Sequence, residues 1–194
     1  MENLTLKQKM ANVFKRYGYY FILGILVVGA ILTMVLVSVA ESKKNNLEPT
    51  NSSAITPYMP VLNATLYKGY YADELTYNST LKQWETHNGI DLQVASGSSV
   101  YSILDGKVKD VYTNVLDGTV VVIEHKDGLT SKYASLASDV KVKVGDDVSR
   151  GDIIGAVSES ANSELEAGAH LHFSMFDNDK KIDPAAYLNI STNK

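Results

Sequence analysis

The hydrophobic and polar positions divide the chain into one long apolar run near the N-terminus and a series of short apolar segments after residue 84. The long run, residues 19–40, reads YYFILGILVVGAILTMVLVSVA and contains no charged side chain. A helix of about 20 residues crosses the roughly 30 Å hydrocarbon core of a bilayer, since each residue adds about 1.5 Å. The run therefore predicts one N-terminal transmembrane helix over residues 19–40.

A cleaved signal peptide is the alternative interpretation of this run. The small residues at 38–40 offer a cleavage point, but the apolar core of a signal peptide has only about 7–15 residues, so an uncleaved anchor is favoured. Positive charge stays on the cytoplasmic side of a membrane, and most of the flanking positive charge precedes the run. Residues 1–18 are therefore expected in the cytoplasm and residues 41–194 outside it. The residues that set this orientation are Lys7, Lys9, Lys15 and Arg16 on one side, against Lys43 and Lys44 on the other.

The region after the apolar run falls into three parts. Residues 41–57, ESKKNNLEPTNSSAITP, are polar without hydrophobic periodicity, which is typical of a linker. Residues 58–83 hold many tyrosines and are expected to pack on the following domain as an approach segment with one or two short strands. Residues 84–190 are expected to form the folded domain.

The folded domain shows the pattern of short strands and tight turns. Runs rich in Val, Ile, Tyr and Thr are broken by Asp-Gly pairs at 105–106, 117–118 and 127–128, which are hairpin signals. Gly145, Gly151 and Gly155 mark further turns. No helix-length stretch shows a hydrophobic period of about 3.6 residues. The pattern predicts an all-β fold, either an antiparallel sandwich or a partly open barrel.

Composition narrows the chemistry that this domain can carry. The chain has 22 acidic and 18 basic residues and a formal net charge of −4, which gives no electrostatic attraction to nucleic acid. It contains no cysteine, so it forms no disulfide although the domain is expected to be exported. Any metal site must therefore use His, Asp and Glu side chains.

Two of the four histidines, His170 and His172, stand two residues apart in the stretch GAHLHFSMFDN, residues 168–178. Alternate residues of a strand project from the same face, so a strand here would direct both imidazoles to one place. Two histidines in a strand can also be structural, each bonded to a backbone carbonyl. The motif alone leaves both interpretations open.

A second motif, WETHNGIDL, holds His87 and Asp91 at a spacing of four residues where a loop enters a strand. Together with one histidine of the 170/172 pair, they would make a site with two histidines and one carboxylate. Catalytic zinc usually has three protein ligands and an open fourth position for water, whose pKa it lowers to about 7. The remaining histidine of the pair would lie beside that water.

Three stretches together resemble the M23 (LytM-type) zinc metallopeptidase family: HNGID at 87–91, GAHLHF at 168–173 and VGDDVSRGDIIG at 144–155. The resemblance implies a small, largely antiparallel β domain with a groove, and zinc-dependent cleavage of peptide cross-links in peptidoglycan. By position, His87, Asp91 and His172 match the zinc ligands, with one Zn²⁺ per chain, and His170 matches a catalytic histidine.

The sequence departs from the family pattern at one position that bears on activity. The family has a second catalytic histidine in a Tyr-x-His-Leu motif, and the matching stretch here is YASL, with Ser135 in place of the histidine. An imidazole exchanges protons near neutral pH, whereas a serine hydroxyl does not. Losing such a group typically reduces the rate by about 10²–10⁴, so the resemblance implies a site that holds zinc but cuts weakly or not at all.

The architecture leaves three hypotheses for function. An anchor, a linker, a tyrosine-rich segment and one imperfect domain resemble members of the family that act in sporulation. Those members lie in the forespore membrane, face the intermembrane space and bind a membrane protein across it. This predicts an interaction module in a sporulation complex. The alternatives are an active endopeptidase acting on peptidoglycan peptides and a regulator of a separate cell-wall hydrolase.

Other aromatic and histidine side chains are expected to have ordinary roles. His125 lies next to an Asp-Gly turn without a partner at ligand spacing, which predicts a surface or structural residue. Trp84 and the tyrosines of residues 67–77 are expected to pack on the domain, because large aromatic side chains are mostly buried.

Overall fold

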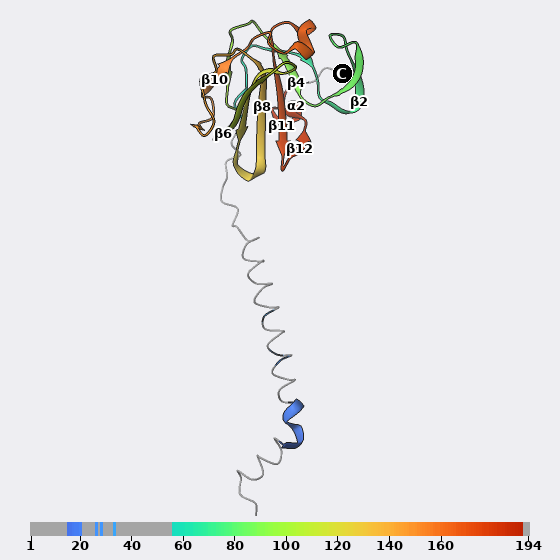
Figure 1. The fold of residues 1–194 in the computed structure, drawn as a ribbon, viewed down its shortest axis with the longest axis vertical. Coiled ribbons are helices and arrows are strands. Elements are labelled where there is room, and N and C mark those ends of the chain that lie inside the picture. Colours follow the sequence, from blue (N-terminus) through green and yellow to red (C-terminus); the bar gives the residue numbers. More distant parts are fainter. Residues whose placement is uncertain (1–14, 21–25, 27, 29–32, 34–55, 192–194) are drawn as a thin grey trace, which may run out of the picture. The chain divides into compact units, whose positions relative to one another are not determined.

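A computed structural model describes residues 15–20, 26, 28, 33 and 56–191, coloured in Figure 1. The chain divides into two compact units, Met1–Ile55 and Thr56–Lys194. The described residues of the first unit are helical. The predicted transmembrane helix and linker fall mostly outside the described residues and stay predictions. Within the described ranges, no helix combines the length and the apolar character needed to cross a bilayer.

The second unit is built around an eight-stranded sheet in which every pair of neighbouring strands is antiparallel. Its strands are β1 (Thr65–Lys68), β4 (Ile90–Gln93), β6 (Gly106–Asn114), β7 (Gly118–Glu124), β8 (Leu129–Leu136), β9 (Asp147–Val148), β11 (His170–Asp177) and β12 (Lys180–Ile182). Their order is β1-β4-β11-β8-β7-β6-β9, and β12 pairs with β11. Figure 1 shows the long strands β8 and β11 side by side within it.

Two small sheets complete the second unit. Strands β2 (Tyr71–Asn78) and β3 (Gln83–His87) form one hairpin, and β5 (Ser99–Tyr101) pairs with β10 (Ile153–Ala156). The helical segments of this unit are short: η1 (Lys126–Gly128), η2 (Asn162–Ala167) and α2 (Pro184–Tyr187). The predicted all-β, antiparallel fold is confirmed, as are short strands within the tyrosine-rich segment.

The glycine turn signals were right in most places and wrong in two. Asp117-Gly118 joins the paired strands β6 and β7, and Asp127-Gly128 lies between β7 and β8, as hairpin turns should. Residues 105–106 connect β5 to β6, which do not pair with each other, because β5 pairs with β10 instead. Gly155 lies within β10 rather than at a turn.

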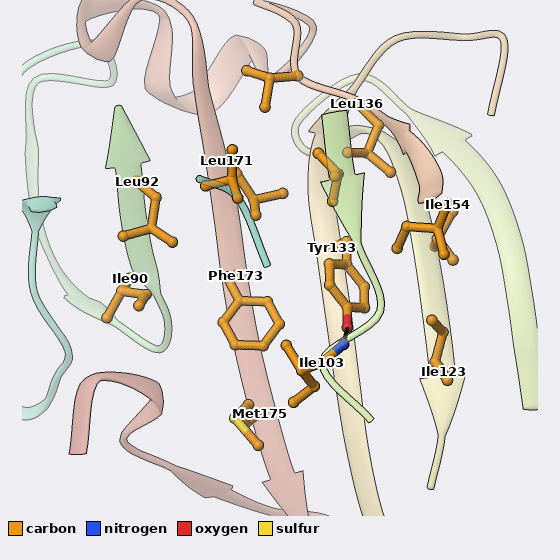
Figure 2. Packing of buried hydrophobic residues seen from close by; sticks show 14 of the residues in the cluster. Ile90, Leu92, Ile103, Ile123, Tyr133, Leu136, Ile154, Leu171, Phe173 and Met175 are labelled. Carbon is orange, nitrogen blue, oxygen red and sulfur yellow. Dashed lines mark hydrogen bonds between the residues drawn. The ribbon is translucent and has the colours of Figure 1, made fainter. Parts of the chain in front are cut away.

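The core lies against one face of the main sheet. In β11 the alternate residues Leu171, Phe173 and Met175 are fully buried, and Figure 2 shows their side chains beside Ile90 and Leu92 of β4. The intervening residues of β11, including both histidines, must project from the opposite face. The alternation along β11 therefore places the apolar side chains on the face toward the core and both histidines on the opposite face.

A buried polar network crosses the core beneath β8. The Tyr133 hydroxyl accepts a hydrogen bond from the Ile103 backbone N–H at 3.0 Å, drawn dashed in Figure 2. It also lies 3.1 Å from Ser131 Oγ, which is 2.7 Å from His125 Nε2. Burial raises the pKa of Tyr133 to about 12. His125 is itself buried, so the structural alternative predicted for it holds and the surface alternative is wrong.

The aromatic side chains of the β2–β3 hairpin are more exposed than the sequence predicts. Trp84 is 66% exposed and Tyr77 is 49% exposed, and their rings meet edge to face with centroids 5.5 Å apart. The expected packing on the domain is therefore wrong for Trp84, Tyr67 and Tyr77. It is right for Tyr70, which packs against the core. The hairpin is a two-stranded sheet separate from the main one, and the rings of Trp84 and Tyr77 are exposed on it.

Candidate metal centre

Strand pairing brings the two halves of the predicted site together. His172 of β11 stands opposite Asp91 of β4 in the antiparallel register, on the face away from the core. His87 ends strand β3 and lies just before β4, which begins at Ile90. The structure thus places all three predicted ligands in one cluster, although His172 and Asp91 are far apart in sequence. His87 and Asp91 are buried, and His172 is partly buried.

The potential ligand atoms of this cluster lie close to one another. Asp91 Oδ1 is 2.9 Å from His172 Nδ1 and 3.3 Å from His87 Nε2. The two histidine nitrogens are 3.4 Å apart. Their rings meet edge to face, with centroids separated by 5.1 Å. The donor set therefore consists of two imidazole nitrogens and a carboxylate oxygen, as the sequence predicts.

Backbone and hydroxyl groups hold the rings in orientation. His87 Nδ1 donates to the Gly69 carbonyl at 2.6 Å, which leaves Nε2 directed into the cluster. His172 Nε2 lies 3.1 Å from Ser174 Oγ and leaves Nδ1 directed inward. Histidines that bind metals usually have such a partner on the other ring nitrogen, because it fixes the tautomer.

A fourth residue, Glu164, belongs to the cluster and was missed by the sequence analysis. Its carboxylate oxygens lie 3.4 Å from His87 Nε2 and 3.2 Å from His172 Nδ1, and its side chain is 12% exposed. Glu164 lies in η2, within the polar stretch SESANSELEAGA that precedes β11. That stretch also contains Glu159 and Glu166, and no periodicity or motif distinguishes the three.

His170 lies at the edge of the cluster. Its Nδ1 donates to the Gly168 carbonyl at 2.8 Å, and its Nε2 lies 3.3 Å from Glu164 Oε2. His170 and His172 therefore share a face of β11 and a common neighbour, but only His172 is among the four residues whose ligand atoms converge.

Ser135, which the resemblance aligns with a second catalytic histidine, is fully buried on β8. Its backbone has a φ of 62°, a left-handed conformation that histidine and asparagine tolerate better than most residues. Its hydroxyl donates to the Ser158 carbonyl at 3.1 Å, and Ser158 forms an isolated bridge with His170. The Ser135 hydroxyl is thus bonded to the backbone of Ser158, the residue that pairs with His170.

Mutual hydrogen bonding governs the protonation of the cluster. Burial alone would lower the pKa of His172, but its hydrogen bonds with Asp91 and Glu164 raise it to about 10. Burial likewise opposes ionisation of Glu164 and Asp91, yet hydrogen bonds from the histidines hold the pKa of both carboxyl groups below the usual range. The two carboxylates therefore favour positive charge among these four side chains.

The donor set also fits a metal cation. Four ligands about 2.0–2.1 Å from a tetrahedral zinc ion lie about 3.3–3.4 Å from one another. The donor separations given above, from 2.9 to 3.4 Å, are close to that value. Asp91 Oδ2 is buried and has no hydrogen-bond partner among the described residues. A buried carboxylate oxygen without a partner is costly, and a cation at this point would stabilise it.

A pocket lies beside the cluster. Asp91 and Glu164 form part of its lining, with Tyr67 of β1 and with Tyr77 and Thr80 of the β2–β3 hairpin. The cluster is therefore reached from the side of the hairpin.

Comparison with known proteins relates this site to one family. The model of peptidase family M23 matches residues 85–184. Stage II sporulation protein Q (SpoIIQ) of Bacillus subtilis is 31% identical over 146 residues, which are 68% of this chain and 50% of that protein. The peptidoglycan DD-endopeptidase ShyA of Vibrio cholerae is 36% identical over 94 residues, 48% of this chain and 21% of that protein. The chain thus spans half or less of the length of these curated relatives.

Solved structures show the same relationship. A chain of the SpoIIQ–SpoIIIAH pore-forming complex superposes with a TM-score of 0.60 and 29% identity, covering 69% of this chain and 90% of that chain. A zinc-containing peptidase from Vibrio cholerae superposes with a TM-score of 0.57 and 28% identity, covering 69% of this chain and 39% of that chain.

Proposed function

The chain belongs to peptidase family M23, and from this premise we propose that it is a membrane-anchored domain that binds zinc and acts mainly as a protein-interaction module in a sporulation complex. In this proposal, residues 19–40 anchor the chain in the forespore membrane, with residues 1–18 in the cytoplasm. Residues 41–57 link the anchor to residues 58–83, which pack on the family domain at 84–190. The domain faces the space between the two membranes.

His87, Asp91 and His172 are the proposed zinc ligands. The convergence of their donor atoms and the unpartnered Asp91 Oδ2 support this assignment. A zinc ion held there would supply a Lewis acid and a nucleophile at neutral pH. His170, oriented by the Gly168 carbonyl, lies on the same face of the sheet, with Nε2 3.3 Å from Glu164 Oε2.

The observation that carries the proposal is the environment of Ser135. A second imidazole is absent at this position, and the hydroxyl is already bonded to the Ser158 carbonyl. A serine in this setting neither accepts a proton near neutral pH nor offers a positive charge to a developing oxyanion. The chain therefore keeps the residues that bind metal and lacks one of those that the family uses to cut.

The proposed partner is a SpoIIIAH-like membrane protein. Support comes from the similarity to SpoIIQ, which forms a complex with SpoIIIAH in the solved structures. In one of these complexes the superposition covers 99% of the matched chain, so the similarity extends over nearly all of the chain present in that complex. Co-purification of the full chain with the SpoIIIAH-like protein of its own organism tests this point. Failure to form a complex at micromolar concentration would contradict it.

Metal analysis tests the zinc site. The purified full chain should contain one zinc per molecule, and Asp91→Asn should lose it because amide oxygens bind zinc poorly. Asp139→Asn is the matched control, since Asp139 is an exposed carboxylate that pairs with Lys141 and lies outside the cluster. Equal zinc content in wild type and Asp91→Asn would refute the ligand assignment.

An active endopeptidase is the second candidate. It is favoured by the similarity to ShyA, a peptidoglycan DD-endopeptidase, and by the position of His170 beside the cluster. Digestion of purified peptidoglycan by the zinc-loaded chain distinguishes the two, since the interaction module should release little or no peptide. A regulator of a separate hydrolase would release none alone but would raise the rate when that hydrolase is added.

A further inference from the structure

We propose that Glu164 is an internal fourth ligand that closes the metal site of this chain, so that small molecules from solution do not reach the metal. This inference rests on the proposed zinc site and adds a statement about which molecules can reach the metal. Catalytic zinc keeps an open position, whereas zinc bound by four protein ligands is typical of structural sites.

The position of the Glu164 carboxylate carries the inference. One oxygen lies 3.4 Å from His87 Nε2 and the other lies 3.2 Å from His172 Nδ1, so the carboxylate reaches two of the proposed ligands at once. One ligand atom from each of Glu164, His87, Asp91 and His172 lies within 4.8 Å of the other three. Glu164 therefore offers a donor to the same point as the three predicted ligands, where a fourth ligand would bind.

The same carboxylate also engages His170. Glu164 Oε2 lies 3.3 Å from His170 Nε2, the only ring nitrogen of His170 not bonded to a backbone carbonyl. A side chain that exchanges protons with a substrate needs this nitrogen free. A single carboxylate, that of Glu164, would therefore both close the metal site and engage the free ring nitrogen of His170.

The backbone around Glu164 is held in place on both sides. The Ser163 hydroxyl and N–H donate to the Leu116 carbonyl at 2.9 and 3.1 Å, and the Ser163 carbonyl accepts from Asn78 Nδ2 at 3.0 Å. On the other side, the Glu166 N–H donates to Thr80 Oγ1 at 3.1 Å. Asn78 and Thr80 belong to the β2–β3 hairpin, so this hairpin and η2 together fix the carboxylate over the site. A mobile surface glutamate would lack these restraints.

The test uses the full chain loaded with Co²⁺ in place of zinc, because the visible spectrum of Co²⁺ reports its coordination. Azide is the probe, as a small anion that binds only where a coordination position is open. In wild type, azide should leave the spectrum unchanged. In Glu164→Ala it should change the spectrum, and zinc affinity should fall at least about tenfold, since even outer-shell changes cost 10–100-fold. Acetate, which restores a carboxylate, should suppress the azide effect in this variant.

Two further variants complete the experiment. Glu166→Ala is the matched control, because Glu166 lies in the same segment and its side chain makes no hydrogen bond or ion pair within residues 56–191. It should behave as wild type. Glu164→Gln keeps the side-chain volume and replaces Glu164→Ala if the alanine variant does not fold.

The outcomes separate this inference from the proposed function. Wild-type chain that takes up neither Zn²⁺ nor Co²⁺ would overturn both. Wild-type chain that takes up metal and whose Co²⁺ spectrum responds to azide as strongly as that of Glu164→Ala would overturn the closure by Glu164 alone and leave the zinc site standing. Zinc affinity that is unchanged in both Glu164 variants would also overturn the closure by Glu164 and leave the zinc site standing.

Discussion

Gly89, in the turn between His87 and Asp91, permits the close approach that the metal site needs. A Cβ atom at this position would lie 2.6 Å from Ser174 Oγ, 2.7 Å from the Phe173 carbonyl oxygen and 2.8 Å from His172 Nε2. Ordinary contacts between carbon and other heavy atoms are about 3.5–4.0 Å. Gly89→Ala must therefore open a gap of roughly 1 Å between the turn and β11. The Phe173 carbonyl belongs to the backbone of a central strand, so the turn and the His172 ring must move instead.

The expected cost follows from this overlap. Overpacking of this size typically costs about 1–3 kcal/mol, and about 2–4 °C of melting temperature is lost per kcal/mol in a chain of this size. The melting temperature of the metal-free chain should therefore fall by about 2–12 °C. Zinc affinity should fall as well, by at least the roughly 10–100-fold that follows disturbance of groups around a metal site, because His172 is a proposed ligand.

Thermal unfolding and competition with a chromogenic zinc chelator measure the two effects. Gly155→Ala is the matched control, since the nearest atoms to a Cβ at Gly155 would be Val140 Cγ1 at 3.5 Å and Leu136 Cδ1 at 3.6 Å, which are ordinary contacts. This control should keep both properties of wild type. If Gly89→Ala bound zinc as tightly as Gly155→Ala and melted at the same temperature, the turn would not position the site and this reasoning would be refuted.

Two further predictions concern Ser135 and His125. Ser135→His should raise peptide release from purified peptidoglycan without changing zinc content, because Ser135 is not a proposed ligand. If wild type cleaved peptidoglycan strongly and Ser135→Ala cleaved it at the same rate, the chain would not need a histidine at this position. Burial lowers the pKa of His125 below 6.5, against the opposing hydrogen bond to the Asp105 carbonyl. The unfolded chain therefore binds the proton more readily, so stability from neutral His125 is present above about pH 6.5 and is lost as pH falls through the lower folded pKa. Urea unfolding between pH 5 and 8 should show this loss, and it should be smaller in His125→Gln; an identical pH dependence in the two would contradict it.

The sequence predicts the parts of the site that depend on local periodicity. The alternation of His170, Leu171, His172 and Phe173 fixes which side chains share a face, because the period of a strand is two whatever it pairs with. Pairing itself is not local. The register that sets His172 opposite Asp91 depends on a contact between segments about 80 residues apart. Ligand chemistry suggested that one of His170 and His172 joins Asp91, and the family resemblance indicated His172. For the same reason the Asp105-Gly106 signal was wrong, since the turn residues say nothing about which strands will pair.

Glu164 shows the limit of sequence reasoning most clearly. Its position depends on hydrogen bonds from Asn78 and to Leu116, which hold η2 across the site. The residue types within SESANSELEAGA do not indicate such contacts. By composition alone, each of its three glutamates could equally be the one near the site. A carboxylate in a polar loop is most often solvated, so only three-dimensional structure separates Glu164 from its neighbours.

Ser135 and Glu164 bear on the same question from independent positions. Replacing an imidazole by Ser135 removes proton transfer and would leave metal affinity unchanged, whereas a fourth ligand at Glu164 would raise affinity and close the site. Both changes favour retention of the metal over reaction at it. Zinc held by His87, Asp91, Glu164 and His172 would join β3, β4, η2 and β11, and a ligand at 100 times its Kd stabilises a folded chain by about 2.7 kcal/mol. A metal used in this way would rigidify the β2–β3 hairpin, which carries the exposed Tyr77 and Trp84. Such a site would hold the shape of a binding surface, as the proposed interaction module requires. A peptidase would instead need an open coordination position on the metal.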